Sequence, residues 1–271
     1  MTQTILITGA SSGIGKATAK HFQSQGWNVV ATMRNPASGS ELAALDNVLV
    51  TRLDVTDATS IKETVHDSID RFGTIDALLN NAGYGAYGPL ESFEMDRIRR
   101  QFDTNVTGLL AVTKSVLPHM RKQKSGIIVN ISSIGGQMTF PLGTLYHGTK
   151  FAVEGLSESL HFELEAIGVR VKIIEPGMIA TNFSGSSFDF ANEPPIDEYQ
   201  GVIEKFMRSM GSNPIPPSPP ELVAEVIWTA VTDGTNQLRY HAGADAEMLL
   251  ANRKAADDAT FIGGLKQQFG L

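Results

Sequence analysis

Short runs of aliphatic and β-branched residues alternate along the chain with longer amphipathic stretches. The runs predict strands at residues 4–8, 27–33, 48–53, 75–79, 126–131, 169–174 and 237–241. The stretches between them predict helices at 13–25, 40–45, 57–71, 95–102, 106–123 and 145–167. The strands are almost continuously apolar, as expected of parallel strands buried on both faces. The pattern therefore predicts an α/β fold, a doubly wound parallel sheet of about seven strands with helices on both faces.

This alternation stops after Pro176. Residues 177–220 mix aromatic residues with glycines, serines and clustered prolines, and one helix is predicted near 196–210. A long irregular segment in a compact domain usually has a function. A helix follows at about 220–232, and the tail after Gly243 begins as a helix that we expect to fray at its glycines. We predict a single domain over residues 1–271, in which 178–220 form a substrate-binding loop or lid.

Composition narrows the class of protein. The 22 basic and 29 acidic side chains give a formal net charge of −7, which argues against a nucleic-acid partner. The chain has no cysteine, and its six histidines show no ligand spacing, so we expect no disulfide and no metal site. No apolar stretch approaches the ~20 residues of a membrane span, and no signal peptide is visible. We expect a soluble, cytoplasmic protein with no membrane partner.

A glycine-rich turn, TGASSGIG, joins the first strand to the first helix. Glycines at such a turn let the backbone approach a pyrophosphate, and the helix N-terminus supplies N–H donors. Alone the motif is a weak indication, because tight turns use glycine anyway. Its place in the chain nevertheless predicts a dinucleotide site of the Rossmann type. The residues concerned are Gly9, Ser11, Ser12, Gly13, Ile14 and Gly15.

The end of the second strand bears on the choice of dinucleotide. A site for NAD usually has an acidic residue there, which binds the ribose hydroxyls. Here the position holds Met33, and Arg34 follows it. A guanidinium can bind a ribose 2′-phosphate, so this pair favours NADP; an ordinary surface arginine is an equally good interpretation.

Three further motifs follow other strands. Asn80-Asn81-Ala82-Gly83 comes after the fourth strand, where a ligand site or a plain turn would both use these residues. Tyr146 and Lys150 are four residues apart on a predicted helix and therefore share a face. A lysine there would lower the pKa of the phenol and suit it to proton transfer. Chance pairs of this kind are common, but Ser133 lies after the fifth strand, at the same edge of the sheet.

Taken together, the motifs resemble one family. TGASSGIG, NNAG, the asparagine of DTNVTG, NISS, YHGTK and the Pro-Gly of IIEPGMIAT occur in order at familiar spacings over residues 3–181. The chain resembles short-chain dehydrogenase/reductases of the ordinary type of about 250 residues. Within that family it is most similar to the hydroxysteroid-dehydrogenase-like and carbonyl-reductase-like members.

The resemblance implies roles for four catalytic residues. Tyr146 would be the general acid in reduction and the base in oxidation, and Ser133 would hydrogen-bond the substrate oxygen. Lys150 would lower the pKa of Tyr146 and bind the nicotinamide ribose. Asn105 would hold a water that links Lys150 to solvent. The implied reaction interconverts a ketone and a secondary alcohol by hydride transfer.

The resemblance to short-chain dehydrogenase/reductases also implies a cofactor site for NADP(H), with NAD(H) the less favoured cofactor. Ser12 departs from the pattern, because many NADP-preferring relatives have a basic residue at that position, so the preference rests on Arg34. Equivalent helices in the family pack against a second subunit, which implies a homodimer or homotetramer. The expected cofactor contacts beyond the glycine-rich turn are Arg34, Asp54, Asn81, Ala82, Gly83, Tyr146, Lys150, Pro176, Gly177, Ile179 and Thr181.

Three apolar segments beside the catalytic residues are expected to form the substrate site. Their proposed contacts are Tyr84, Met138, Phe140, Phe183 and Phe188. We see no cluster of Lys or Arg in these segments, so a bulky apolar carbonyl compound or alcohol is the expected substrate. The alternative is a non-catalytic dinucleotide-binding regulator on the same fold, which would have no need of all four catalytic residues. Reduction of a carbon–carbon double bond is disfavoured, because enoyl reductases of this superfamily usually use a longer Tyr–Lys spacing.

Overall fold

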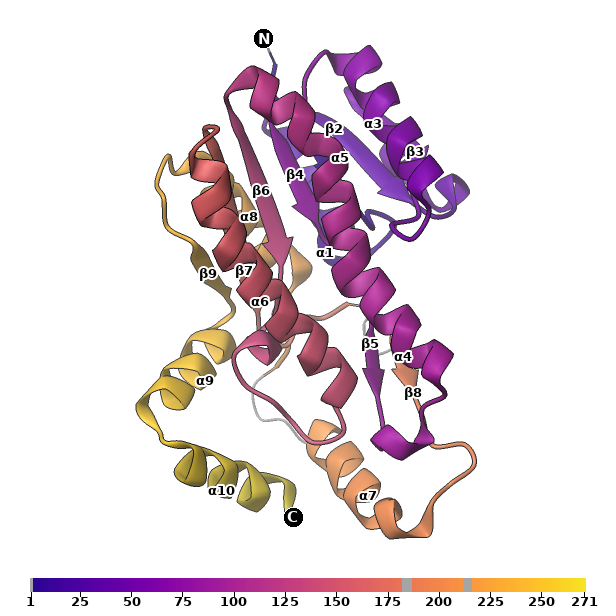
Figure 1. Cartoon of the computed structure of the whole chain (residues 1–271), viewed down its shortest axis with the longest axis vertical. Helices are drawn as coiled ribbons and strands as arrows, with labels where there is room; N and C mark the ends of the chain where they lie inside the picture. Colours follow the sequence, from indigo (N-terminus) through magenta and orange to yellow (C-terminus); the bar gives the residue numbers. More distant parts are fainter. Residues whose placement is uncertain (1, 182–186, 212–215) are drawn as a thin grey trace.

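A parallel sheet of seven strands forms the centre of the molecule (Figure 1). The computed structural model describes residues 2–181, 187–211 and 216–271. The spatial order of the strands is β3-β2-β1-β4-β6-β7-β9, which confirms the predicted doubly wound, Rossmann-type sheet. The strands are β1 (Thr4–Ile7), β2 (Asn28–Met33), β3 (Val48–Arg52), β4 (Ala77–Asn80), β6 (Gly126–Ile131), β7 (Val169–Pro176) and β9 (Arg239–Ala242).

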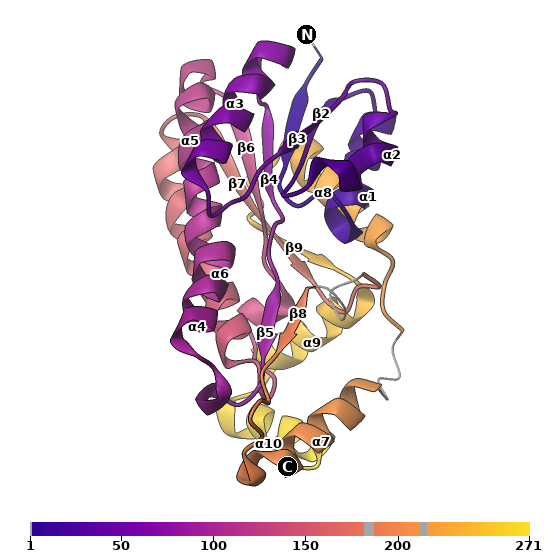
Figure 2. The same ribbon diagram turned by 90° about the vertical axis from the view of Figure 1, so that its right-hand side faces the viewer.

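Helices cover both faces of this sheet (Figure 2). One face carries α1 (Gly13–Ser24), α2 (Ser40–Ala43) and α8 (Pro220–Thr232); the other carries α3 (Ala58–Phe72), α5 (Gly108–Gln123) and α6 (Thr144–Glu165). Phe22 is fully buried on the first face, where it packs edge-to-face against Trp27 and Trp228 at 5.2 and 5.1 Å. In the parts of the chain that the structure describes, no helix has both the length and the apolar character that crossing a membrane requires.

The helix before β6 is longer than predicted. Instead of two separate helices, α4 (Met95–Phe102) runs through a π-helical turn (Asp103–Thr107) into α5. The predicted break near residues 102–106 is therefore wrong, because the π-turn widens the helix without ending it. Such turns are frequent at functional sites, and this one contains Asn105.

Three helices lie beyond the carboxyl ends of the strands: α7 (Asp197–Gly211), α9 (Ala244–Ala255) and α10 (Asp258–Phe269) (Figures 1 and 2). The expected fraying of the tail at Gly263 and Gly264 is wrong. Asp257 caps α10 by accepting a hydrogen bond from the Thr260 N–H, and Phe269 is buried at its far end. The helix ends at Gly270, which adopts the left-handed conformation with φ 69°. Short 3₁₀ turns occur at Pro36–Gly39, Leu90–Ser92 and Ile134–Gly136.

A second, smaller sheet extends from the carboxyl edge of the first. It pairs β5 (Gly85–Tyr87) with β8 (Phe188–Phe190) in parallel, with Tyr87 opposite Phe190. Arg97 and Arg100 both form ion pairs with Asp189, at 2.5 and 3.2 Å, and so attach β8 to α4. Both strands are only three residues long and far apart in sequence, so the hydrophobic pattern did not predict them.

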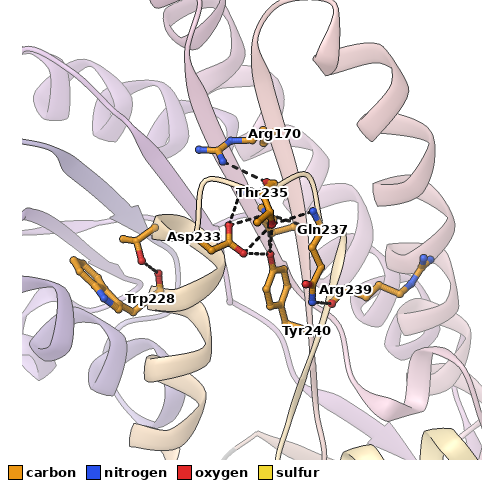
Figure 3. A network of polar contacts seen from close by, with 9 residues as sticks. Arg170, Trp228, Asp233, Thr235, Gln237, Arg239 and Tyr240 are labelled. Carbon is orange, nitrogen blue, oxygen red and sulfur yellow. Dashed lines mark hydrogen bonds and ion pairs between the residues drawn. The ribbon is translucent and has the colours of Figure 1, made fainter.

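A polar network fixes the loop that leads into the edge strand β9 (Figure 3). The Tyr240 hydroxyl donates to Asp233 at 2.5 Å, and the Thr235 hydroxyl donates to the same carboxylate at 2.9 Å. Beneath them the fully buried Lys172 donates to the carbonyls of Thr235 and Gln237 at 2.8 and 2.9 Å. Because each buried polar group has a partner, the network holds the last strand in register.

Candidate active site

A cavity of about 1580 Å³ opens at the carboxyl ends of the strands, where a doubly wound sheet is expected to bind its ligands. Most of the predicted site residues line it. Asn105 and Gly15 lie just behind the lining, Met138 lies elsewhere, and Phe183 is outside the described residues. Those at the surface of the cavity are Gly9, Ser11, Ser12, Gly13, Ile14, Arg34, Asp54, Asn81, Ala82, Gly83, Tyr84, Ser133, Phe140, Tyr146, Lys150, Pro176, Gly177, Ile179, Thr181 and Phe188.

The glycine-rich turn presents backbone to the cavity. A side chain at position 15 would place its Cβ 2.4 Å from the Gly9 carbonyl oxygen, so only glycine allows the helix to start so close to the turn. Ser12 is the N-cap of α1, yet its side chain makes no capping hydrogen bond, and the first turn of α1 holds no acidic residue. The N–H groups at this helix end are therefore open to an anionic group such as a pyrophosphate.

Asn81 fixes the shape of this turn from the next strand. Its side-chain amide donates to the carbonyl oxygens of Thr8 and Gly9 at 2.9 and 3.0 Å. The Thr8 hydroxyl accepts in return from the backbone N–H groups of Asn81 and Ala82. The motif after β4 thus has a structural role that the sequence analysis did not assign, although the same residues line the cavity.

Arg34 lies at the end of β2 on the rim of the cavity. It is exposed, and no ion pair involving it occurs among the described residues, whereas Met33 before it is 3% exposed. Asp54, after β3, accepts hydrogen bonds from the N–H and hydroxyl of Thr56 at 3.0 and 2.7 Å. The side of the cavity beside β2 therefore offers an unpaired guanidinium.

Ser133, Tyr146 and Lys150 meet where β6 and α6 adjoin the cavity. The Ser133 hydroxyl accepts from the Gly135 N–H at 3.0 Å, and the Lys150 Nζ donates to the Ile131 carbonyl at 2.8 Å. That Nζ lies 5.8 Å from the centre of the Tyr146 ring. A hydrogen bond joins the side chains of Ser133 and Tyr146, so the three residues share one wall of the cavity.

Burial dominates the titration of these groups. It raises the pKa of Tyr146, against the lowering expected from Lys150, while a hydrogen bond with Ser133 acts in the lowering direction. Burial also lowers the pKa of Lys150 to about 8, opposed by the nearby charge of Glu154. In the protein alone Tyr146 is accordingly a proton donor near neutral pH, and Lys150 titrates close to the pH at which it would pass on a proton.

Asn105 holds the loop that follows β4. Its side chain donates to the Tyr84 carbonyl at 2.9 Å and accepts from the Tyr84 N–H at 3.1 Å. It also donates to the Thr149 hydroxyl at 3.2 Å, next to Lys150 in α6. The π-helical turn thus connects the NNAG loop to the helix that carries Tyr146.

His147 fastens the segment between Ser133 and Tyr146. Its Nδ1 lies 3.0 Å from the Gly135 carbonyl, and its Nε2 accepts from the Phe140 N–H at 3.0 Å. The ring is therefore neutral with its proton on Nδ1, and burial lowers the pKa of His147. The sequence analysis missed this role, because nothing at position 147 marks the contact.

Aromatic rings continue the wall of the cavity from Tyr146. Tyr87 lies between Tyr146 and Phe188, with ring centres 5.4 and 5.2 Å away, and Phe206 stacks on it at 6.0 Å. Phe269 from α10 stacks in turn on Phe206, with ring centres 6.0 Å apart and ring planes 10° apart. Tyr87, Phe188 and Phe206 lie in the apolar segments that were expected to form the substrate site, whereas Phe269 was not expected there.

Two predictions about the substrate side need correction. Met138 is 1% exposed and packs with Ala246 and Leu250, so it belongs to a core beneath α9 and does not contact the cavity. The lining also includes cations, namely Arg100, Lys205 and Arg208, of which Arg100 is paired with Asp189. The last two lie one turn apart on α7, so the lining contains neighbouring cations that were not expected there.

Comparison with known proteins identifies the family. The family model described as short chain dehydrogenase matches residues 3–192. The chain belongs to this family. An uncharacterized oxidoreductase of Schizosaccharomyces pombe is 47% identical to it over 242 residues, covering 88% of this chain and 100% of the relative. The resemblance inferred from the ordered motifs is thus confirmed.

Solved structures of other short-chain dehydrogenases share the whole fold. One from Streptomyces avermitilis has a TM-score of 0.85 and 33% identity, covering 100% of this chain and 99% of that one. A closed serine dehydrogenase complexed with NADP⁺ has a TM-score of 0.74 and 30% identity, covering 88% and 94%. Structures with this fold hold NADP or NAD. This short-chain dehydrogenase is therefore an oxidoreductase that acts on an alcohol or carbonyl with a nicotinamide cofactor.

Proposed function

We propose that the protein reduces a bulky apolar ketone to a secondary alcohol with NADPH. The observation that carries the proposal is that Ser133 and Tyr146, which are hydrogen-bonded to each other, line the same cavity as the glycine-rich turn and the aromatic residues. A ketone beside these two residues would meet both donors at its oxygen. The aromatic side of this cavity, with two hydroxyl groups beside it, is typical of sites for hydrophobic ligands.

The residues present fit a nicotinamide dinucleotide. The uncapped start of α1 and the open backbone of the glycine-rich turn suit its pyrophosphate, and the unpaired Arg34 suits a ribose 2′-phosphate. The NADP⁺ in the serine dehydrogenase structure supports the same choice. When bound, the cofactor supplies the hydride.

The chain's own residues then act on the oxygen of the ketone. Ser133 and Tyr146 donate hydrogen bonds to it, which stabilise the negative charge that develops as the carbonyl is reduced. Tyr146 gives up its proton as general acid, and its raised pKa keeps that proton in place until the reaction requires it. Lys150, with a pKa near 8, replaces the proton, and Asn105 keeps the helix and the NNAG loop together beside it.

The proposal extends to the rest of the chain. We propose one catalytic domain over residues 1–271, with 178–220 covering the substrate, in a cytoplasmic homodimer or homotetramer. Phe151 and Phe162 on α6 are 46% and 71% exposed, which supports a subunit contact on this helix. Neither a nucleic acid nor a membrane is part of the proposed function.

Initial rates of NADPH oxidation test the substrate class. The panel contains aryl and alicyclic ketones, a steroid ketone, a quinone, an aldehyde, a reducing sugar, an acyl thioester and a keto acid. We expect the highest kcat/KM for the bulky apolar ketones and recovery of the matching alcohols. A sugar, thioester or keto acid preferred over every apolar ketone would contradict the proposal, and a preferred keto acid would assign Lys205 and Arg208 to substrate binding.

A further inference from the structure

Tyr87 places a second phenol beside the proposed general acid. Its ring centre is 5.4 Å from that of Tyr146, and the two planes differ by 31°. Tyr87 is the last residue of β5, whose pairing with β8 fixes its backbone, and its side chain lines the cavity while only 8% exposed. The cavity wall therefore carries two neighbouring phenols, and the proposed mechanism uses one of them.

The hydroxyl of Tyr87 has no hydrogen-bond partner among the described residues. The hydroxyl faces the cavity, so a water or a ligand there can supply the missing partner. Burial raises the pKa of Tyr87 well above its usual value of 10, and a negative charge on Tyr146 would raise it further. This hydroxyl is accordingly a proton-bearing donor at every working pH, in electrostatic contact with Tyr146.

The surroundings of Tyr87 limit what could accept its hydrogen bond. Phe188 and Phe206 stack on its ring, with ring centres 5.2 and 6.0 Å away. His147 adjoins it at 6.1 Å, but the two nitrogens of that ring already contact Gly135 and Phe140. The oxygen that undergoes reduction already receives two donors, from Ser133 and Tyr146. A third donor close to Ser133 and Tyr146 suits a second oxygen of the same ketone, a few bonds from the carbonyl that is reduced.

We propose that Tyr87 is a second substrate-binding hydroxyl, which donates a hydrogen bond to an oxygen next to the reacting carbonyl. The preferred substrates are then apolar ketones with an α-hydroxyl or α-oxo group. This inference rests on the proposed function and narrows its substrate class. A site built to bond such an oxygen discriminates against the analogue that lacks it.

Tyr87→Phe tests the inference with a matched pair of ketones. Benzoin and deoxybenzoin share two phenyl groups and a carbonyl, and differ in one α-hydroxyl. We expect the variant to lose about threefold to tenfold in kcat/KM for benzoin, the range for one neutral hydrogen bond. Deoxybenzoin should change less than twofold. Tyr199→Phe is the control, because its hydroxyl lies outside the cavity and donates to Glu91 at 3.2 Å.

An equal loss for both ketones would overturn the inference, since Tyr87 would then act only by packing against Tyr146. No loss for either would overturn it as well. Binding of the two ketones to the NADP⁺-loaded protein, measured by calorimetry, makes the same comparison without turnover. Wild-type protein that binds benzoin through Tyr87 but reduces neither ketone would contradict the proposed function and leave Tyr87 as a ligand contact.

Discussion

The glycine-rich side of the cavity and its aromatic side are built in opposite ways. The first is a continuous turn at the start of α1, held by Asn81 from the adjacent strand. The second is assembled from β5, β8, α6, α7 and α10, which bring Tyr87, Phe188, Tyr146, Phe206 and Phe269 together from distant parts of the chain. Backbone atoms suit a ligand that does not change when side chains are exchanged, whereas a side built from side chains can change its ligand by substitution. Changes on the two sides should therefore have separable effects.

Tyr146 lies where the two sides meet, so its loss should have the largest effect. Tyr146→Phe removes the proposed proton donor and keeps the ring that packs on Tyr87. We expect turnover to fall by about 10²–10⁴-fold, the usual contribution of general acid catalysis. The dissociation constant of NADPH, measured by fluorescence titration, should stay nearly the same. Near-normal turnover in the folded variant would remove Tyr146 from the mechanism.

A change confined to the glycine-rich side should alter the choice of cofactor alone. Met33→Asp combined with Arg34→Ala adds a repulsive carboxylate and removes a guanidinium. We expect the ratio of kcat/KM for NADPH over NADH to fall by about tenfold to a hundredfold. The ranking of ketones should not change. Arg52→Ala is the control, because that exposed arginine is paired with Asp57 at 3.1 Å. A wild-type enzyme that prefers NADH would contradict this interpretation of β2.

A change confined to the aromatic side should alter the choice of ketone alone. Phe269→Ala removes the ring that stacks on Phe206 and whose centre lies 6.3 Å from that of the Phe140 ring. We expect kcat/KM for large ketones to rise relative to small ones by up to about tenfold, as pocket size usually dictates. The KM for NADPH should be unchanged. Phe261→Ala provides the control on the same helix, since its ring packs against Arg253. An equal change in the ketone preference of both variants would mean that α10 affects selectivity only through its folding, and that Phe269 does not shape the substrate site.

A buried acid on β7, paired with His241 of β9, should affect stability but not the selectivity for cofactor or ketone. Glu175 is fully buried near Glu154, Arg239 and His241, and bonded to Gln137. Burial, and then Glu154, raise the pKa of Glu175 from 4.5 to about 8. Between pH 4.5 and pH 8 the Glu175 carboxyl is therefore protonated in the folded protein and ionised in the unfolded chain. The free energy of unfolding accordingly falls as the pH rises from 4.5 to 8.

Glu175→Gln removes this titration. We expect its Tm to exceed that of the wild type by about 2 °C or more at pH 8.5 and to match it below pH 5. Differential scanning calorimetry across that range measures the difference. A Tm difference that does not depend on pH would show that Glu175 does not carry the raised pKa.

The same contrast explains what could be predicted from the sequence. The sheet depends on local runs of buried apolar residues, and this prediction agrees with the structure. The glycine-rich turn and the spacing from Tyr146 to Lys150 are local patterns too, and the structure places these residues along one cavity. The aromatic side depends on contacts such as Phe140 with Phe269, which lie far apart in the chain. No local pattern marked β5 and β8, the ordered α10 or the place of Met138, because packing between distant segments decides each of them.

Transfer of labelled hydride tests the central claim most directly. The purified protein is incubated with NADPH that carries deuterium at the transferable position of the nicotinamide, together with the best apolar ketone of the panel. We predict one alcohol formed for each NADPH oxidised, with deuterium on the carbon that bears the new hydroxyl. Tight binding of NADPH without labelled alcohol from any ketone would contradict the account and indicate a dinucleotide-binding regulator.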